Sequence, residues 1–142
     1  MCKEYLNLRK KHQKEHDEFP IAYAFNKEQL AEALEKLGAK DISECVTIFN
    51  IGDIVKKEDA DRYLAMIDRH SKELHEAMLN EEFAEEAFLY EMDNHEYAIN
   101  YDGDGDVLRC FDMNFDILRK MNLVGAYNRA RRRHMKKAEE WF

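Results

Sequence analysis

Proline, glycine and cysteine are scarce in this chain of 142 residues, which has one proline, five glycines and three cysteines. Cys2, Cys45 and Cys110 are odd in number, lie far apart and form no C-x-x-C pair, which argues against a disulfide framework and against a cysteine zinc site. No glycine-containing segment matches a phosphate-binding sequence motif, and neither Ser43 nor Ser71 lies in a nucleophile-elbow motif. We therefore expect no cofactor and no covalent acyl-transfer chemistry.

Long apolar runs are also missing, since no segment approaches the roughly 18 residues that a membrane-spanning helix needs. The N-terminal sequence MCKEYLNLRKKHQKEH has no apolar core of the signal-peptide kind. We therefore expect a cytoplasmic protein without a membrane partner. The hydrophobic share of 45% can build one core, and no repeat or linker divides the chain, so a single domain over residues 1–142 is expected.

Charge is distributed unevenly around the formal net charge of -8. Twelve acidic residues and a single basic one, Arg109, lie between Glu81 and Asp116. From Arg119 to the C-terminus the balance reverses, with eight basic and two acidic residues. Such asymmetry bears on binding and solubility more than on the fold.

The first half of the chain alternates helical and strand patterns. Helical spacing over residues 3–19 ends at Pro20, and the apolar run from Ile21 to Phe25 predicts a short strand. Asn26 is placed as a helix N-cap, Gln29 as its capping-box partner and Gly38 as the helix stop. Cys45–Ile51 and Ile54–Val55 then predict a hairpin around Gly52-Asp53.

The second half is predominantly helical. A long apolar stripe predicts a helix from Glu58 to Met78, and Asn80 caps another that extends to Ile99. Residues 107–111 and 115–121 are short helical candidates, and Asn122 is expected to cap a final helix over residues 123–141. The fold class is therefore α+β, with about five helices packed on a small three-stranded antiparallel sheet or hairpin. The expected core includes Phe25, Leu34, Phe49, Ile67, Phe88 and Met92.

The segment His12-Gln13-Lys14-Glu15-His16 matches the H-x-x-E-H sequence motif of a class of zinc peptidases. A catalytic zinc site also needs a third protein ligand and a sheltered cleft, and no partner motif follows in the sequence. We expect this segment to be structural, with His12 on the apolar stripe of the helix and His16 in solvent.

The segment YDGDGD offers oxygen ligands in a flexible turn suited to calcium. Aligned on an EF-hand loop, Asn100, Asp102 and Asp104 occupy positions one, three and five, but position twelve is Phe111 instead of a glutamate. Asp106 is the remaining candidate ligand. Such a site would be weak, and a surface turn that caps the next helix explains the same residues, so no metal is assigned.

The predicted final helix carries its apolar residues and its basic residues on different faces. One arc carries apolar residues and a histidine, namely Leu123, Tyr127, Ala130, His134, Ala138 and Trp141. A different arc carries the basic residues Arg129, Arg132, Arg133, Lys136 and Lys137. This basic face predicts contact with nucleic-acid phosphates or with an acidic partner. The alternatives are a solvated face and compensation of the protein's own acidic helix.

Three segments together resemble an uncharacterised family of small proteins from bacteriophage and gut-bacterial genomes. The matching features include HQKEHDEFPIAYAFNKEQLAEALEKLG from His12 to Gly38, IVKKEDADRY with Lys57-Glu58-Asp59, and FLYEMDNHEYAIN with Asn94-His95-Glu96-Tyr97. The resemblance covers about two-thirds of the chain. It implies a shared α+β fold and a mobile-element setting, and it carries no activity, cofactor or catalytic residue.

The function expected from these patterns is that of a non-enzymatic cytosolic accessory or protein-interaction module with an unknown protein partner. One alternative is a nucleic-acid-associated protein that uses the basic final helix, and another is a weak calcium-binding protein. The sequence assigns no catalytic residue and predicts no oligomeric state.

Overall fold

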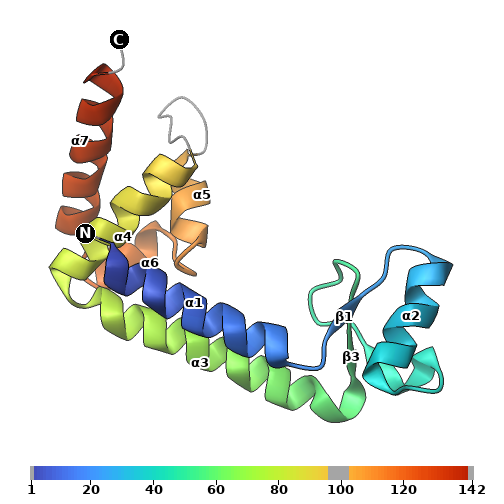
Figure 1. Cartoon of the computed structure of the whole chain (residues 1–142). Helices are drawn as coiled ribbons and strands as arrows, with labels where there is room; N and C mark the ends of the chain where they lie inside the picture. The colour runs from blue at the N-terminus through green and yellow to red at the C-terminus, as the bar shows by residue number, and fades with distance from the viewer. Residues whose placement is uncertain (1, 96–102, 141–142) are drawn as a thin grey trace. The chain divides into compact units, whose positions relative to one another are not determined.

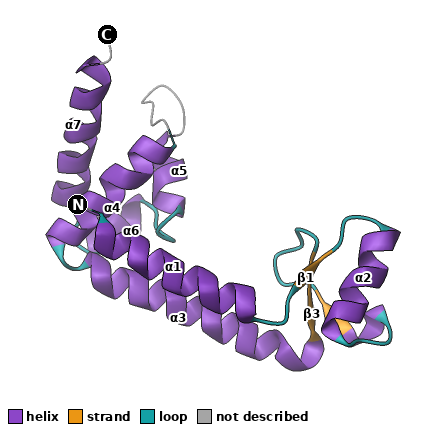
Figure 2. Cartoon of the chain, viewed as in Figure 1, coloured by secondary structure: helices purple, strands orange, loops and turns teal. Residues whose placement is uncertain are grey.

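A computed structural model describes residues 2–95 and 103–140, which form mainly helices with a small sheet (Figures 1 and 2). In chain order the elements are α1 Lys3–Glu18, β1 Ala22–Tyr23, α2 Lys27–Leu37, the 3-10 helix η1 Ile42–Glu44, β2 Cys45–Val46, β3 Asp53–Lys56, the 3-10 helix η2 Lys57–Asp59, α3 Ala60–Met78, α4 Glu81–Asn94, α5 Gly103–Arg109, α6 Phe115–Lys120 and α7 Val124–Glu140. The α+β class is confirmed. The described residues contain seven α-helices instead of about five.

Two compact units make up the chain. The sheet unit comprises residues 11–69, and the helical unit comprises residues 1–10 and 70–142. Both α1 and α3 contribute residues to each unit. The expectation of a single domain over residues 1–142 stays a prediction.

The sheet unit is built on three short antiparallel strands in the order β1-β3-β2, with Ala22 opposite Ile54 and Cys45 opposite Lys56. Successive side chains of β3 point to opposite faces of the sheet. Val55 packs on one side with residues of α3, whereas Ile54 packs on the other with residues of α2. Two small apolar clusters therefore stabilise strands that would be marginal on their own.

Asn26 and Gly38 cap α2 as predicted, and the side chain of Gln29 explains why the first strand is short. Asn26 Oδ1 accepts a hydrogen bond of 2.8 Å from the backbone N–H of Gln29, and Gly38 ends the helix with φ 70°. Gln29 Oε1 accepts a 2.8 Å bond from the N–H of Phe25 instead of the N–H of Asn26, which corrects the predicted capping box. Phe25 therefore belongs to the helix cap, and the prediction that it is a strand and core residue is wrong, since it is 74% exposed.

The predicted turn at Gly52-Asp53 is also wrong, because Asp53 is the first residue of β3 and the loop spans residues 47–52. The buried Asp53 carboxylate organises this loop by accepting bonds from Thr47 Oγ1 at 2.7 Å and from the N–H groups of Ile48 and Phe49 at 2.9 and 3.0 Å. A fourth bond comes from the N–H of Ile51 at 3.1 Å.

These bonds determine the charge state of Asp53. Burial favours the neutral acid, but the four hydrogen bonds to the carboxylate outweigh burial and hold the pKa of Asp53 well below its usual range. The loop carries Phe49 outward, with 49% of its surface exposed, so its predicted place in the core is wrong as well. Leu34 and Ile67 are partly buried.

The helical unit holds the larger core, and the predicted burial of Phe88 and Met92 is confirmed. The ring of Phe88 lies 5.0 Å from that of Phe111 and 5.1 Å from that of Tyr127, both in edge-to-face geometry. These contacts join α4 to the segment after α5 and to α7, and α4 packs extensively along α7.

Three boundaries in the helical unit differ from the prediction. The described part of α4 ends at Asn94, and residues 96–99 of the predicted helix lie outside the described residues. Gly103 begins α5, so residues 103–106 are helical instead of a loop. Asn122 has φ 58° and ends the turn after α6, so its predicted role as the N-cap of α7 is wrong. Asn114 instead caps α6 through a bond to the N–H of Ile117.

Candidate functional site

The predicted basic face of α7 is turned in part toward the acidic helix α4. Arg129 Nε lies 2.6 Å from Glu85 Oε1, and Arg133 Nη1 lies 2.8 Å from Glu85 Oε2 and 2.7 Å from Glu86 Oε1. The hydrogen bond and charge of Arg133 lower the pKa of Glu86, and those carboxylates raise the pKa of Arg133. Within the helical unit these cations therefore serve as counter-charges.

One turn further along α7, a second set of side chains pairs with Asp93 of α4. His134 Nδ1 lies 2.7 Å from Asp93 Oδ1, and Lys137 Nζ lies 3.0 Å from Asp93 Oδ2. Burial favours neutral Asp93, but the bonds from His134 and Lys137 outweigh it and lower the pKa of that carboxyl. Three of the five predicted basic contact residues, Arg129, Arg133 and Lys137, are thus paired with α4.

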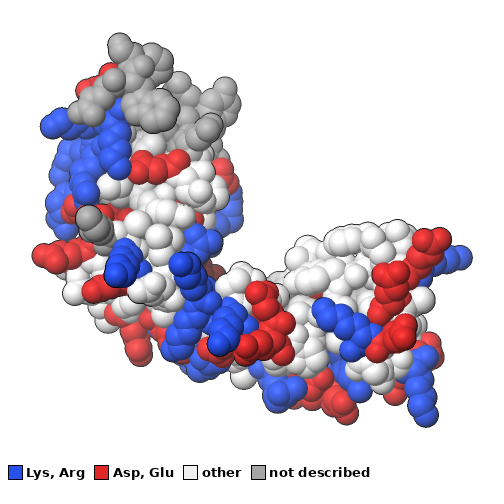
Figure 3. Space-filling view, viewed as in Figure 1, with Lys and Arg blue, Asp and Glu red and all other residues white. Residues whose placement is uncertain are grey.

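The other two basic residues, Arg132 and Lys136, are exposed and pair with no other residue in the described part of the chain. Figure 3 shows the basic side chains gathered over α7. Of the predicted packing arc, Leu123, Tyr127 and Ala130 are buried, and His134 has a side chain only 12% exposed. The side chains of Ala138 and Trp141, which complete that arc, lie outside the described part.

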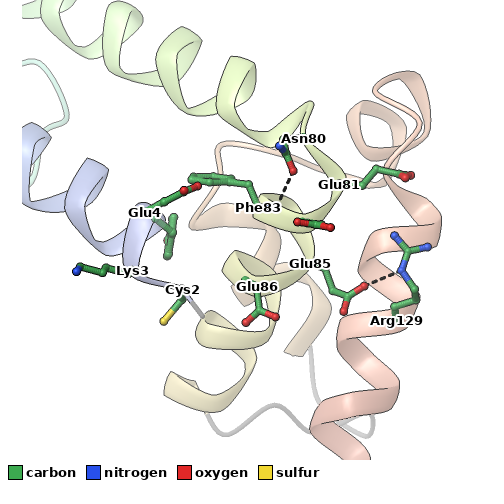
Figure 4. A pocket seen from close by; sticks show the side chains of 11 residues that line it. Cys2, Lys3, Glu4, Asn80, Glu81, Phe83, Glu85, Glu86 and Arg129 are labelled. Atoms are coloured by element: carbon green, nitrogen blue, oxygen red, sulfur yellow. Dashed lines mark hydrogen bonds and ion pairs between the residues drawn. The ribbon is translucent and has the colours of Figure 1, made fainter.

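A pocket of about 590 Å³ opens in the helical unit between the N-terminal turn of α1 and the start of α4 (Figure 4). Its lining is acidic, with Glu4, Glu81, Glu82, Glu85 and Glu86 beside Lys3 and Arg129. Glu85 and Glu86 are already bonded to arginines of α7. Their charge therefore stabilises the contact between α4 and α7.

The H-x-x-E-H residues do not converge on a metal site. His16 Nε2 lies 3.0 Å from the hydroxyl oxygen of Tyr63, and Glu15 forms an ion pair with Arg69. His16 is thus half-buried, which corrects the expectation that it is solvated. The segment anchors α1 to α3 within the sheet unit.

Of the four candidate calcium ligands, two lie among the described residues and two do not. Asn100 and Asp102 lie outside them. Asp104 and Asp106 lie in the first turn of α5, where Asp104 accepts a hydrogen bond from Tyr127 and Asp106 pairs with Arg109. In the described structure both carboxylates therefore have protein partners.

A cluster that the sequence analysis missed lies where the end of α4 meets the end of α5. Cys110 Sγ lies 3.3 Å from His95 Nε2, and the same nitrogen lies 3.4 Å from Glu91 Oε2. The three ligand atoms all lie within 4.8 Å of one another. Among the described residues, this is the one such group of three or more histidine, cysteine and acidic side chains.

Glu91 is the buried centre of this cluster, with 1% of its surface exposed. Arg9 Nη1 lies 2.7 Å from Glu91 Oε1 and supplies its counter-charge. Burial, together with the nearby Glu91 carboxylate, raises the pKa of the Cys110 thiol to about 12 and raises the pKa of the Tyr5 hydroxyl as well. Without a further cation, Cys110 is therefore a neutral thiol.

The sequence carried one signal of this cluster, the spacing of four residues between Glu91 and His95, which places both on one face of a helix. A pair of ligand types on one helix face is not a complete metal motif, and Cys110 belongs to no C-x-x-C pair. Cys110 lies 15 residues beyond His95. Only the packing of α5 against α4 brings it to the other two.

A second missed feature is an apolar patch on the sheet unit, formed by four exposed side chains: Tyr23, Phe25, Phe49 and Ile51. The end of β1 adjoins the end of the loop, because the N–H of Ala24 bonds to the carbonyl of Gly52 and the Phe25 ring packs over Gly52. Figure 3 shows a broad area without charged side chains over this part of the sheet unit.

Beside the apolar patch lies a groove of about 320 Å³ between β1 and α2. Tyr23, Phe25 and Ala33 line it together with Glu32 and Lys36, which supply one charge of each sign. A groove of this lining can take an apolar side chain with polar neighbours.

Residues 4–133 match a family of unknown function, DUF7659, and the chain belongs to this family. The predicted resemblance to an uncharacterised family is confirmed to that extent. No curated protein and no solved structure matches the chain significantly. None of the helices in the described residues is both long enough and apolar enough to span a bilayer.

Proposed function

We propose that this DUF7659 protein is a non-enzymatic, cytoplasmic interaction module of a phage or mobile element, and that it binds a protein partner through the apolar patch. The observation that carries the proposal is the exposure of Phe25 (74%) and Ile51 (61%) beside the exposed rings of Tyr23 and Phe49. Single exposed apolar side chains are ordinary, but contiguous apolar surface marks interaction sites.

Hydrogen bonds order the backbone that carries the apolar patch. The four hydrogen bonds to Asp53 fix the loop that carries Phe49 and Ile51, and the cap of α2 fixes the backbone of Phe25. A surface that is ordered in advance loses less conformational entropy on association. This order favours a specific binding role for the loop over a merely tolerated exposure.

The groove beside the patch supports a partner with an apolar anchor residue. Aromatic rings flanked by Glu32 and Lys36 suit a segment that inserts an aliphatic or aromatic side chain and presents polar groups at its rim. We therefore propose a folded protein partner with an exposed apolar anchor residue.

The nucleic-acid alternative has less support. Arg129, Arg133 and Lys137 are paired with carboxylates of α4, so contact with phosphates would compete with these pairs. The outward cations of α7 are Arg132 and Lys136, with the half-exposed Arg131 beside them. Two or three phosphate contacts contribute little affinity at physiological salt.

The experiment compares three baits in a lysate of the native host: the unchanged protein, the double variant Phe25→Ser/Ile51→Ser, and the control Leu79→Ser. Leu79 is 63% exposed but lies in the helical unit. Any protein enriched by the unchanged bait is then purified, and its affinity is measured directly. We expect the double variant to bind about tenfold more weakly or worse, because anchor residues dominate binding energy, and the control to bind normally. A partner that binds all three baits equally, or only nucleic acid in the eluate, contradicts the proposal.

A further inference from the structure

We propose that Glu91, His95 and Cys110 bind one zinc ion that joins the end of α4 to the end of α5. The donors would be Glu91 Oε2, His95 Nε2 and Cys110 Sγ. The cluster lies in the helical unit, whereas the apolar patch lies in the sheet unit, so this inference is independent of the proposed binding function.

The geometry favours a metal over a catalytic triad. In a Cys-His-carboxylate triad the carboxylate holds one ring nitrogen of the histidine while the other nitrogen faces the thiol. Here both Glu91 and Cys110 approach the same atom, His95 Nε2, at 3.4 and 3.3 Å. Convergence of three lone-pair donors on one region orients no proton relay, and it is the arrangement that a cation requires.

The separations fit the dimensions of a zinc site. Zinc binds nitrogen and oxygen at about 2.0–2.2 Å and sulfur at about 2.3 Å, which in a tetrahedron places nitrogen about 3.3–3.5 Å from oxygen and about 3.5–3.6 Å from sulfur. The 3.4 Å between His95 Nε2 and Glu91 Oε2 lies within the first range, and the 3.3 Å between His95 Nε2 and Cys110 Sγ needs an expansion of about 0.2 Å. All three ligand atoms lie within 4.8 Å of one another. A mixed set of thiolate, imidazole and carboxylate is typical of zinc, and hard cations such as calcium prefer oxygen ligands alone.

The surroundings prepare Glu91 for this role. Arg9 holds Oε1 at 2.7 Å, which orients the carboxylate and leaves Oε2 toward His95 and Cys110. Outer partners of this kind commonly fix the ligands of metal sites. On binding, the Cys110 S–H bond breaks, its proton passes to solvent, and the thiolate forms the bond to zinc. The ion, Arg9 and the two anionic ligands then leave one net positive charge. Before binding, the Cys110 S–H donates at 3.4 Å to the backbone carbonyl of Asp106, one helical turn earlier in the chain.

Glu91 is buried, whereas His95 has a side chain 39% exposed and Cys110 is half-buried. The site therefore has access to solvent for the metal to enter and for water to occupy a fourth position. Because Glu91 and His95 lie at the end of α4 and Cys110 directly follows α5, the ion would stabilise the contact between these helices.

The test uses the full-length protein, freed of metal by chelation and titrated with zinc by calorimetry. Cys110→Ser and His95→Gln remove one ligand each, and Cys45→Ser is the matched control at another half-buried thiol. Circular dichroism verifies that each variant keeps its helices. We expect one zinc per chain, an affinity weakened about tenfold or more in both ligand variants, and an unchanged affinity in the control. Cobalt in place of zinc should show thiolate charge-transfer absorption that Cys110→Ser removes.

Three results would overturn the proposal. One is the failure of the unchanged protein to bind zinc. Another is equal zinc affinity in the folded Cys110→Ser and His95→Gln variants. The third is an equal loss of zinc in Cys45→Ser, which would show that the thiols bind metal without a defined site.

Discussion

The Nε atom of Arg129 lies 2.6 Å from Oε1 of Glu85, a residue 44 positions earlier in the chain. This pair converts part of the uneven charge distribution into an internal contact, because the basic helix α7 neutralises the acidic helix α4 beside it. Some cations of α7 pair with α4 and others point outward, so mutations can change one group without the other.

Reversal of a paired cation should destabilise the helical unit, whereas reversal of an outward one should not. Arg133→Glu removes contacts to Glu85 and Glu86 and places a third carboxylate beside them. We expect a loss of about 1–2 kcal/mol in the free energy of unfolding. Arg132→Glu, the adjacent control, should stay within about 0.5 kcal/mol. Urea unfolding followed by circular dichroism measures both, and equal values for the two variants contradict the assignment.

Binding to DNA should be weak, with a shallower salt dependence than the full basic face of five cations would give. With Arg131, Arg132 and Lys136 as the cations outside the α4 pairs, about two or three phosphate contacts are possible, and log K against log salt should have a slope of about −2 to −3. Fluorescence anisotropy with a labelled duplex measures the slope. A steeper slope of about −5 would show that Arg129, Arg133 and Lys137 leave α4 to bind phosphates.

Asp53 should make the stability of the sheet unit depend on pH in the acid range. Its pKa in the folded chain lies below the unfolded value of about 3.9, so its stabilisation is present above that pH and is lost as the pH falls through the folded pKa. Asp53→Asn should lower stability by about 1–3 kcal/mol at neutral pH, because bonds to a buried acceptor are lost.

The gap between Asp53→Asn and the unchanged protein should narrow as the pH falls from about 5 to about 2. Amide hydrogen exchange at Ile48 and Phe49, which bond to Asp53, reports on this loop directly. Equal protection of these amides in both proteins at neutral pH would show that Asp53 does not organise the loop.

Phe88 and Phe25 test which aromatic residues form the core. Phe88 is completely buried, so Phe88→Ala should cost about 3–5 kcal/mol of unfolding free energy. Phe25→Ala, at a residue 74% exposed, should cost about 0.5 kcal/mol or less. Thermal unfolding compares the two, and a large loss in Phe25→Ala would show that its ring is packed in solution.

Local signals in the sequence predicted much of the secondary structure. Asn26, Gln29 and Gly38 define α2 through contacts within a few residues, and such contacts depend little on the rest of the chain. Local signals alone are insufficient at Phe25 and Asn122. An apolar run predicts burial only if the chain continues as a strand, and a helix cap diverts Phe25 outward.

The candidate sites could be predicted only in part. The sequence shows that α7 has a basic face, and only tertiary packing shows which cations meet carboxylates of α4. The same applies to Cys110, whose neighbours Glu91 and His95 belong to another helix. The apolar patch depends on the path of one loop, which a single buried carboxylate sets through four hydrogen bonds.

Photo-crosslinking from position 25 tests the central claim most directly. A photoreactive phenylalanine analogue replaces Phe25 in one protein and Leu79 in the control, since both side chains are exposed and lie in different units. We predict that illumination in native-host cells joins position 25 to one other protein, at a segment with an aliphatic or aromatic anchor, and that position 79 gives no such product. Crosslinks that form equally from both positions, or that join position 25 only to a second copy of this chain, would contradict a role in binding a distinct protein partner.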